Sequence, residues 1–361
     1  MKWSLKIGQF RGIGVYVHFT FFLLLGFIAY SHWNVSHNIG DALNAVAFVL
    51  ATFFCVVLHE FGHSLMAAYY GIRTRDITLL PIGGVAQLER MPDKPLQELW
   101  VALAGPLVNV AIAIALVGWL VVSQSFQPWH ELTVTSGPFL ERLLIVNVFL
   151  VVFNMLPAFP MDGGRVLRAG LALLLDYTQA TQIAAVVGQA MALLFGLFGI
   201  LSGNWFLVFI AFFVWIGAAS EASVAQLKSA LAGLPVARAM MTRFHILHPE
   251  NPIQHVLSLV VGGTQHDFPV VENNEVVGVL TRQRLIQGLT SLGPESSVRE
   301  SMETEFVTVD ASEMLEVALQ KLQSCACTTV PVLSQGRLVG LLTMENVGEF
   351  VAIQTALRNR R

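Results

Sequence analysis

Two histidines and a glutamate lie within an apolar run that is long enough to cross a lipid bilayer. The run covers about residues 45–70 and contains the motif His59-Glu60-Phe61-Gly62-His63. Histidines four positions apart lie on the same face of an α-helix, about 40° apart around its axis. Ionisable side chains are costly to bury in such a segment. We therefore expect them to pair, to bind an ion or to face a wet cavity.

The spacing of this motif predicts a zinc site. Two neutral imidazoles at positions i and i+4 suit a zinc ion, which lowers the pKa of a bound water to about 7. Glu60, directly after the first histidine, is placed to take a proton from that water. A pattern with three fixed positions also arises by chance, but chance is a poor explanation inside an apolar segment, where the three groups are costly.

The composition indicates an integral membrane protein with a soluble part. Of the 361 residues, 55% are hydrophobic and 12% are charged, whereas globular domains carry about 25% charged residues. The net charge of −3 argues against nucleic acid as a main partner. The three cysteines, Cys55, Cys325 and Cys327, lack the number and spacing of a disulfide framework. We interpret Cys325-x-Cys327 as incidental rather than redox-active.

Six apolar segments predict a polytopic α-helical membrane domain. The first follows a basic start but lacks the small-residue cleavage site of a signal peptide, so we interpret it as a retained span. Between the second and third spans, residues 77–89 contain Gly83-Gly84 and are too short to span and too apolar for an ordinary loop. They predict a short membrane-associated strand or re-entrant hairpin beside the motif. The predicted spans are residues 14–30, 41–70, 97–122, 137–156, 180–201 and 205–219.

The distribution of basic residues predicts the orientation of this domain. Lys and Arg gather on one side of the six-span arrangement, whereas residues 31–40, 123–136 and 203–204 contain neither. The basic side is expected to be cytoplasmic, with Arg142 as the one exception. Both termini, the His59–His63 motif and Asp162 are then expected on or near the cytoplasmic side.

The C-terminal part of the chain is an internal repeat with an offset of 62 residues. For example, Met240-x-Thr242-x-Phe244 matches Met302-x-Thr304-x-Phe306. Two copies are too few for a solenoid, so they predict a soluble α/β pair of domains. Hairpins are expected at residues 268–280 and 329–342, with Asn273-Asn274 and Gln335-Gly336 as their turns.

With these motifs assembled, residues 1–222 resemble the site-2 protease family of intramembrane zinc metalloproteases. Met161 stands where that family usually has leucine. The resemblance assigns His59, His63 and Asp162 as the ligands of one zinc ion per chain and Glu60 as the catalytic base. A catalytic zinc does need three protein ligands and one open position, although Asp162 could instead cap a helix. The matching pieces are His59-Glu60-Phe61-Gly62-His63, Gly83-Gly84, Ala104-Gly105-Pro106-x-x-Asn109, and Asn154-x-x-Pro157 leading to Met161-Asp162-Gly163.

This resemblance implies hydrolysis of peptide bonds within or near the transmembrane segments of single-span proteins. Gly83 and Gly84 could pair with an extended substrate segment. Asn154 or Asn109 could stabilise the oxyanion, although interhelical hydrogen bonding is the alternative for both. A membrane cation transporter or channel and an inactive zinc-holding scaffold are rival functions. The first rival is disfavoured because ion permeation does not require Glu60 directly after His59.

The tail resembles a tandem pair of CBS domains, expected at residues 236–293 and 297–355 after a linker at residues 223–235. This resemblance implies an adenine nucleotide bound between the repeats and a homodimer formed through the CBS domains. We expect the whole protein in a prokaryotic plasma membrane. Nucleotide-binding copies usually carry Asp three residues after a threonine, but Arg284 follows Thr281 and Asn346 follows Thr343. Thr281, Thr343 and Asn346 are the candidate nucleotide contacts. A purely structural dimerising module is the alternative.

Overall fold

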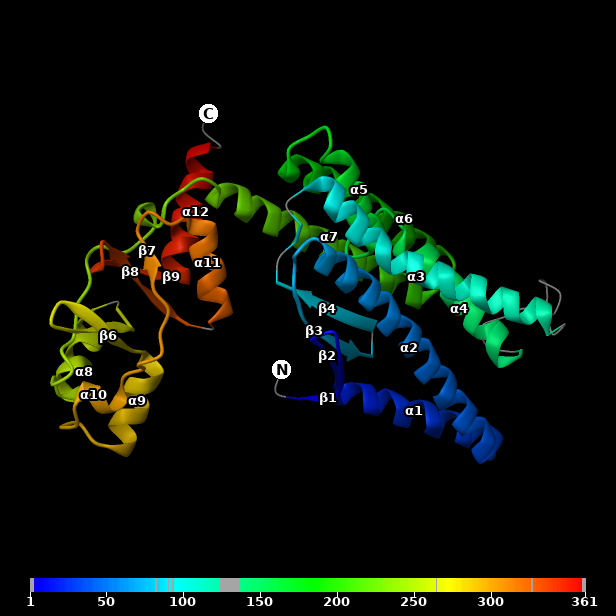
Figure 1. Cartoon of the computed structure of the whole chain (residues 1–361), viewed down its shortest axis with the longest axis horizontal. Helices are drawn as coiled ribbons and strands as arrows, with labels where there is room; N and C mark the ends of the chain where they lie inside the picture. The colour runs from blue at the N-terminus through cyan, green and yellow to red at the C-terminus, as the bar shows by residue number, and fades with distance from the viewer. Residues whose placement is uncertain are drawn as a thin grey trace. The chain divides into compact units, whose positions relative to one another are not determined.

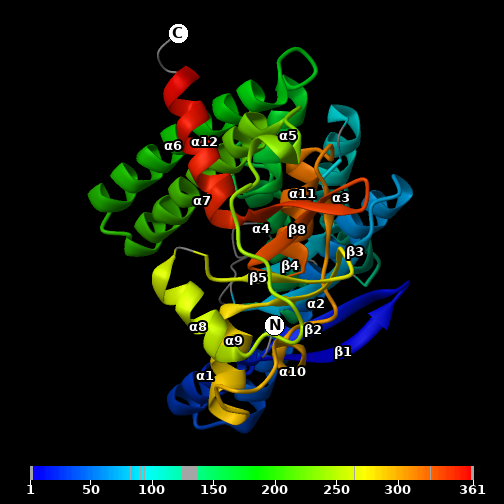
Figure 2. The same cartoon turned by 90° about the vertical axis from the view of Figure 1, so that its left-hand side faces the viewer.

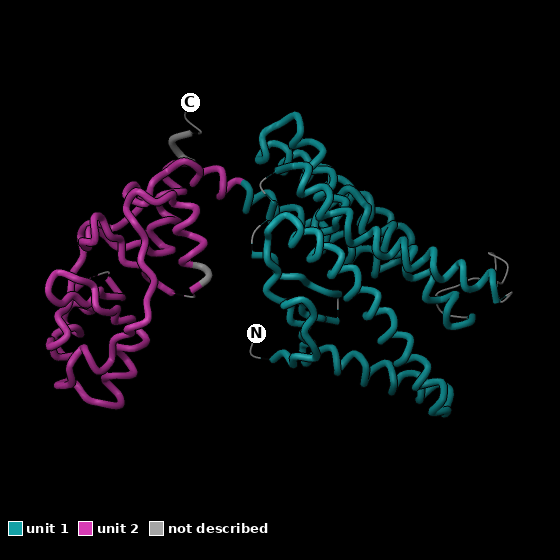
Figure 3. Tube along the Cα trace, in the orientation of Figure 1, with its two compact units in different colours: residues 1–225 teal, residues 226–361 magenta. Residues whose placement is uncertain are grey.

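The computed structural model describes residues 3–81, 83–89, 91–92, 94–123, 137–263, 265–325 and 327–358. The chain divides into two compact units, residues 1–225 and 226–361 (Figure 3). Helix α7 (Trp205–Leu231) includes residues 223–231, which the sequence had placed in a linker. This part of the expected linker is therefore helical.

Long helices form most of the first unit. Four of them, α2, α3, α6 and α7, are long and apolar enough to cross a membrane. The other two predicted spans correspond to α1 and α4, which have 18 and 16 residues. Among the described residues, the structure thus supports four candidate spans. The helices before α7 are α1 (Phe19–Ser36), α2 (Ile39–Tyr69), α3 (Pro95–Val122), α4 (Phe139–Asn154), α5 (Asp162–Leu171) and α6 (Tyr177–Leu201).

A four-stranded sheet lies beside α2 and has the order β1-β2-β3-β4 (Figures 1 and 2). The β2–β3 pair is parallel, and the two outer pairs are antiparallel. Residues 77–80 and 83–88 of the expected element belong to this sheet, which is larger than the short β element expected from the sequence. The strands are β1 (Ser4–Phe10), β2 (Ile13–His18), β3 (Thr74–Leu80) and β4 (Gly83–Leu88).

The start of the first predicted span is a strand, which corrects the helix expected over residues 14–30. Val15 and Val17 of β2 are buried opposite Ile77 and Leu79 of β3. These side chains gain more burial as alternating strand positions than they would on a lipid-facing helix. His18 then begins α1 as its cap, because its Nδ1 accepts a hydrogen bond from the backbone N–H of Thr20 at 3.3 Å.

Small residues let α2 and α3 cross closely. A Cβ atom added to Gly62 of α2 would lie only 2.6 Å from the backbone oxygen of Ala104 on α3. Without a side chain at this position, the two backbones can approach each other, as is usual for helices that pack within a membrane. The crossing point lies within the His59–His63 motif. It therefore brings α3 directly against the metal-ligand candidates.

The second unit contains the two predicted repeats, and both hairpins are confirmed. Asn273 and Asn274 have φ values of 52° and 69°, and Gln335 and Gly336 have 50° and 79°. Two-residue hairpin turns of this kind need positive φ at both positions. The elements are η2 (Val236–Arg238), α8 (Ile253–Gly262), β5 (Phe268–Glu272), β6 (Glu275–Leu280), α9 (Arg282–Ser291), α10 (Val298–Ser301), β7 (Val309–Asp310), α11 (Leu315–Ser324), β8 (Thr329–Ser334), β9 (Arg337–Thr343) and α12 (Met344–Arg358).

A buried aspartate joins the two repeats. One Asp267 carboxylate oxygen accepts a hydrogen bond from the hydroxyl of Thr329 at 2.7 Å, and the other accepts from the backbone N–H of Arg282 at 2.9 Å. Asp267 and Thr329 are separated by 62 residues, the repeat offset. Equivalent positions of the two copies are therefore in direct contact through a hydrogen bond.

Cys325 and Cys327 form a disulfide bond in the structure. The interpretation of the pair as incidental rather than redox-active stays untested. Cys325 directly follows α11, which ends at Ser324.

Candidate metal centre

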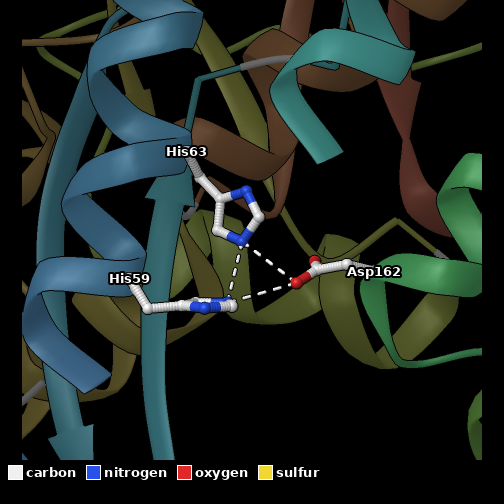
Figure 4. Close-up of side chains that lie close together, drawn as sticks. All are labelled: His59, His63 and Asp162. Carbon is white, nitrogen blue, oxygen red and sulfur yellow. Dashed lines mark hydrogen bonds and ion pairs between the residues drawn. The ribbon is translucent and has the colours of Figure 1, made fainter. Parts of the chain in front are cut away.

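Three buried side chains converge between α2 and α5 (Figure 4). His59 and His63 lie one turn apart on α2, and Asp162 is the first residue of α5. Asp162 Oδ2 lies 3.1 Å from His59 Nε2 and 3.2 Å from His63 Nε2, and the two Nε2 atoms are 3.1 Å apart. The structure thus brings together residues that are about 100 positions apart in the sequence.

Hydrogen bonds at the Nδ1 atoms of both imidazoles fix their tautomers. His59 Nδ1 lies 2.6 Å from Asn109 Oδ1, and His63 Nδ1 lies 2.7 Å from the backbone oxygen of Val101. A backbone oxygen can only accept, and Asn109 is oriented so that its oxygen faces His59. Each Nδ1 therefore donates its hydrogen, which leaves each Nε2 with a free lone pair.

This donor set fits a zinc ion. Two imidazole lone pairs and one carboxylate oxygen face each other without a hydrogen between the two Nε2 atoms, an arrangement that a cation stabilises. Ligands about 2.0–2.1 Å from a tetrahedral zinc are about 3.3 Å apart, close to the 3.1–3.2 Å observed. His59, His63 and Asp162 could hold the ion together. The outer hydrogen bonds are of the kind that orient metal-bound histidines.

Asn109 continues into a chain of buried amides. Its Nδ2 donates to Asn147 Oδ1 on α4 at 2.8 Å, and Asn147 Nδ2 donates to the backbone oxygen of Leu143, also at 2.8 Å. Asn109 thus makes the interhelical hydrogen bonds that were the alternative to an oxyanion role. The sequence analysis missed Asn147, although an asparagine in the middle of an apolar helix was an available signal.

Gly105 forms the wall of the site on α3. A Cβ atom added there would lie 2.7 Å from His59 Nε2 and closer still to His63 Nε2. In the sequence this residue appeared only as part of a motif shared with the family. In the structure, its missing side chain leaves the space in which the two imidazoles converge.

Glu60 and the β4 strand lie next to this centre. Glu60 follows His59 on α2, and a Cβ atom on Gly84 would lie 2.9 Å from Glu60 Cγ and 3.4 Å from Glu60 Oε1. Gly83 begins β4 with a φ of 141°, a value that L side chains rarely adopt. Gly84 therefore allows the edge strand to pass the glutamate closely, and Gly83 permits the backbone conformation with which the strand begins.

Asn154 is the last residue of α4 and is partly buried. In the described part of the chain, the short polar contacts of the three ligand candidates are with one another, with Asn109 and with Val101. Asn154 is outside this group.

The candidate nucleotide contacts fall in two different cavities of the second unit. A cavity of about 550 Å³ is lined by residues of both repeats, including Thr343 and Asn346. In it, the Thr343 hydroxyl donates to Asn346 Oδ1 at 2.7 Å. Thr281 lines the other cavity, of about 430 Å³. Arg284, which stands in place of the usual aspartate there, is paired with Glu303 at 2.9 Å.

Two histidines from one helix, a carboxylate from another and a glutamate beside the first histidine define a metal centre of the hydrolytic zinc type. Comparison with protein families agrees with this class. The model of peptidase family M50 matches residues 47–137 and 130–195, and the CBS domain model matches residues 236–291 and 296–352.

Individual relatives cover nearly the whole chain. A zinc metalloprotease of Methanocaldococcus jannaschii is 34% identical over 348 residues, 96% of this chain and 96% of that relative. A relative from Synechocystis is 29% identical over 367 residues, covering 96% of this chain and 95% of its own length. The solved site-2 protease of M. jannaschii is 39% identical, with a TM-score of 0.45, over 61% of this chain and 95% of that one.

The chain belongs to peptidase family M50, the site-2 protease family, and carries a tandem CBS pair. Both resemblances drawn from the motifs are thereby confirmed.

The narrow space at Gly105 predicts that a single methyl group disrupts the metal centre. We expect Gly105→Ala to lower the zinc content of the purified protein at least about tenfold, because loss of ligand positioning costs about 10- to 100-fold in metal affinity. Gly118→Ala on the same helix is the matched control, since a Cβ atom there meets no atom within 4 Å. Zinc per chain is measured by mass spectrometry of the metal. Equal zinc content in the two variants would contradict the placement of α3.

Proposed function

We propose that the protein is a zinc-dependent intramembrane endopeptidase that cuts within or near the transmembrane segments of other membrane proteins. The observation that carries this proposal is the convergence of His59, His63 and Asp162 at 3.1–3.2 Å, with Glu60 next to the first histidine. Membership of peptidase family M50 supports it. The motif also lies on α2, a helix that is long and apolar enough to span a membrane.

The side chains divide the chemistry among them. When bound, zinc polarises the scissile carbonyl and makes water a better nucleophile at neutral pH. His59 and His63 supply neutral nitrogen ligands, and Asp162 supplies the negative charge that partly balances the ion. Glu60 takes a proton from the attacking water and later gives it to the leaving amine. Burial of the three ligands limits access of bulk water to the site.

A substrate helix has to unwind before it is cut, because a helix holds its amides in i to i−4 hydrogen bonds. An extended segment needs new partners for those amides in an apolar surrounding. The edge strand β4 supports such pairing, since Gly84 lies beside Glu60 and β3 is the only strand paired with β4 among the described residues. Asn154 remains a candidate for positioning the substrate or its oxyanion.

The membrane arrangement we propose has six spans, with α1 and α4 added to the four long helices. The distribution of Lys and Arg supports a cytoplasmic N-terminus, CBS pair and active site. Relatives from prokaryotes support a prokaryotic plasma membrane. We further propose single-span membrane proteins as substrates and a homodimer formed through the CBS pair.

The rival proposal is a membrane cation transporter or channel controlled by the CBS pair, with the buried cluster as part of an ion pathway. It predicts metal flux without peptide cleavage. The position of Glu60 beside the ligands favours hydrolysis, because a pathway for ions needs no general base.

Replacing the general base gives the direct test of hydrolysis. Glu60→Gln is expected to keep about one zinc per chain and to lower cleavage of tagged single-span substrates at least about 100-fold, because general base catalysis supplies about 10²–10⁴-fold. Glu89→Gln, at an exposed glutamate, is the control. Both are assayed as full-length protein in detergent.

Cleavage that persists in the Glu60→Gln variant would refute the assignment of the base. Zinc in both proteins, with no cleavage by the wild type and metal flux in vesicles, would favour the transporter instead.

We also propose that the CBS pair regulates the protease by binding an adenine nucleotide beside Asn346. The cavity of about 550 Å³ there is lined by polar groups of both repeats, among them Gln265, Arg282 and Thr329. The cavity beside Thr281 is the weaker candidate, because Arg284 is paired with Glu303 and cannot accept a ribose hydrogen bond.

Isothermal titration of the full-length protein with AMP and ATP tests the nucleotide proposal. We expect binding at millimolar ligand or below, and at least about fivefold weaker binding by Asn346→Ala, the effect of losing about 1 kcal/mol of hydrogen bonding. Gln283→Ala, which changes the other cavity, is expected to leave the affinity unchanged. No heat with either nucleotide would favour a purely structural dimerising module.

A further inference from the structure

A buried arginine on α5 pairs with acidic residues from two other helices. Arg168 Nε donates to Glu98 Oε1 at 2.7 Å, and another of its guanidinium nitrogens donates to Glu221 Oε2 at 2.9 Å. The Arg168 and Glu98 side chains are only 2% and 3% exposed, whereas Glu221 is 31% exposed. Charges buried this deeply are retained only when they are paired, and removal of one partner leaves the other uncompensated.

The ring of Phe159 further encloses this guanidinium. Its centroid lies 5.0 Å from the Arg168 carbon that joins the three nitrogens, and the ring of Tyr177 lies at 5.1 Å. A planar guanidinium held by a carboxylate and by ring faces has one preferred orientation, unlike a flexible ammonium. Arg168 can therefore fix the position of the helix that carries it.

That helix begins with Asp162, and no side chain of the described residues caps its N-terminus by a hydrogen bond. Glu98 lies in the first turn of α3, the helix that also provides Val101 and Asn109 to the two histidines. One helix thus holds the imidazoles directly and holds α5 through Glu98. The separation between Asp162 and the imidazoles depends on how α5 lies against α3.

We propose that Arg168 is a positioning residue for the metal centre, acting through its pair with Glu98 to keep Asp162 against His59 and His63. Glu221 on α7 is the second and weaker partner, because its side chain is partly exposed. The proposal rests on the proposed function, because it takes His59, His63 and Asp162 as the zinc site. It adds a requirement outside the His59–His63 motif, namely the buried ion pair that Glu98 forms with Arg168, six residues after Asp162.

The rate of zinc release measures this role without relying on catalysis. Full-length protein is loaded with zinc in detergent and mixed with excess chelator, and thermal unfolding of the metal-free protein is followed in parallel. We expect Glu98→Gln to release zinc about tenfold faster or more. Arg168→Lys, which keeps the charge but loses the planar fork, should be intermediate. Glu221→Gln should change the rate less than threefold. Arg75→Lys, at an exposed arginine, is the control.

The outcomes separate positioning from general stability. Zinc release within twofold of wild type in both Glu98→Gln and Arg168→Lys would overturn the proposal, even if the metal-free proteins unfold at lower temperature. Failure of both variants to fold would assign the ion pair to folding and also overturn it. A wild-type protein that holds zinc but cuts no substrate would refute the proposed activity and leave this comparison intact.

Discussion

The mutual approach of two imidazole nitrogens and one carboxylate oxygen is the interaction on which the first unit depends. The three atoms lie 3.1–3.2 Å apart among buried side chains. Such a group is costly in an apolar helix bundle unless a cation joins its members. The hydrogen bonds to Asn109 and Val101 are also needed for such a site, because they orient the Nε2 lone pairs of both histidines toward the same point.

Helix α3 is the template for this centre. Glu98, Val101, Gly105 and Asn109 are spaced by three, four and four residues and therefore share one face of the helix. This face forms the ion pair to α5 and the two contacts that orient the histidines. It also leaves, at Gly105, the space in which the two imidazoles converge. The His59–His63 motif on α2 therefore depends on these four residues on one face of α3.

The sequence predicted the parts of the structure that local pattern determines. The His59–His63 spacing, the 62-residue repeat and the turns at Asn273 and Gln335 all follow from short-range rules. Residues 14–18 were misassigned because a short apolar run suits a buried strand as well as a helix, and only pairing with β3 decides between them. Asp162 needed the family resemblance, since its partners lie about 100 residues away. Arg168 had no local signal, because its role depends on helices that meet only in the fold.

X-ray absorption at the zinc edge of the purified full-length protein tests the central claim most directly. The account predicts two imidazole nitrogens at about 2.0–2.1 Å together with oxygen ligands at about 2.0–2.2 Å, and no sulfur. It also predicts that Asp162→Asn alters this oxygen shell while both imidazoles remain. A sulfur ligand at about 2.3 Å, or a spectrum with fewer than two imidazoles, would contradict the site formed by His59, His63 and Asp162.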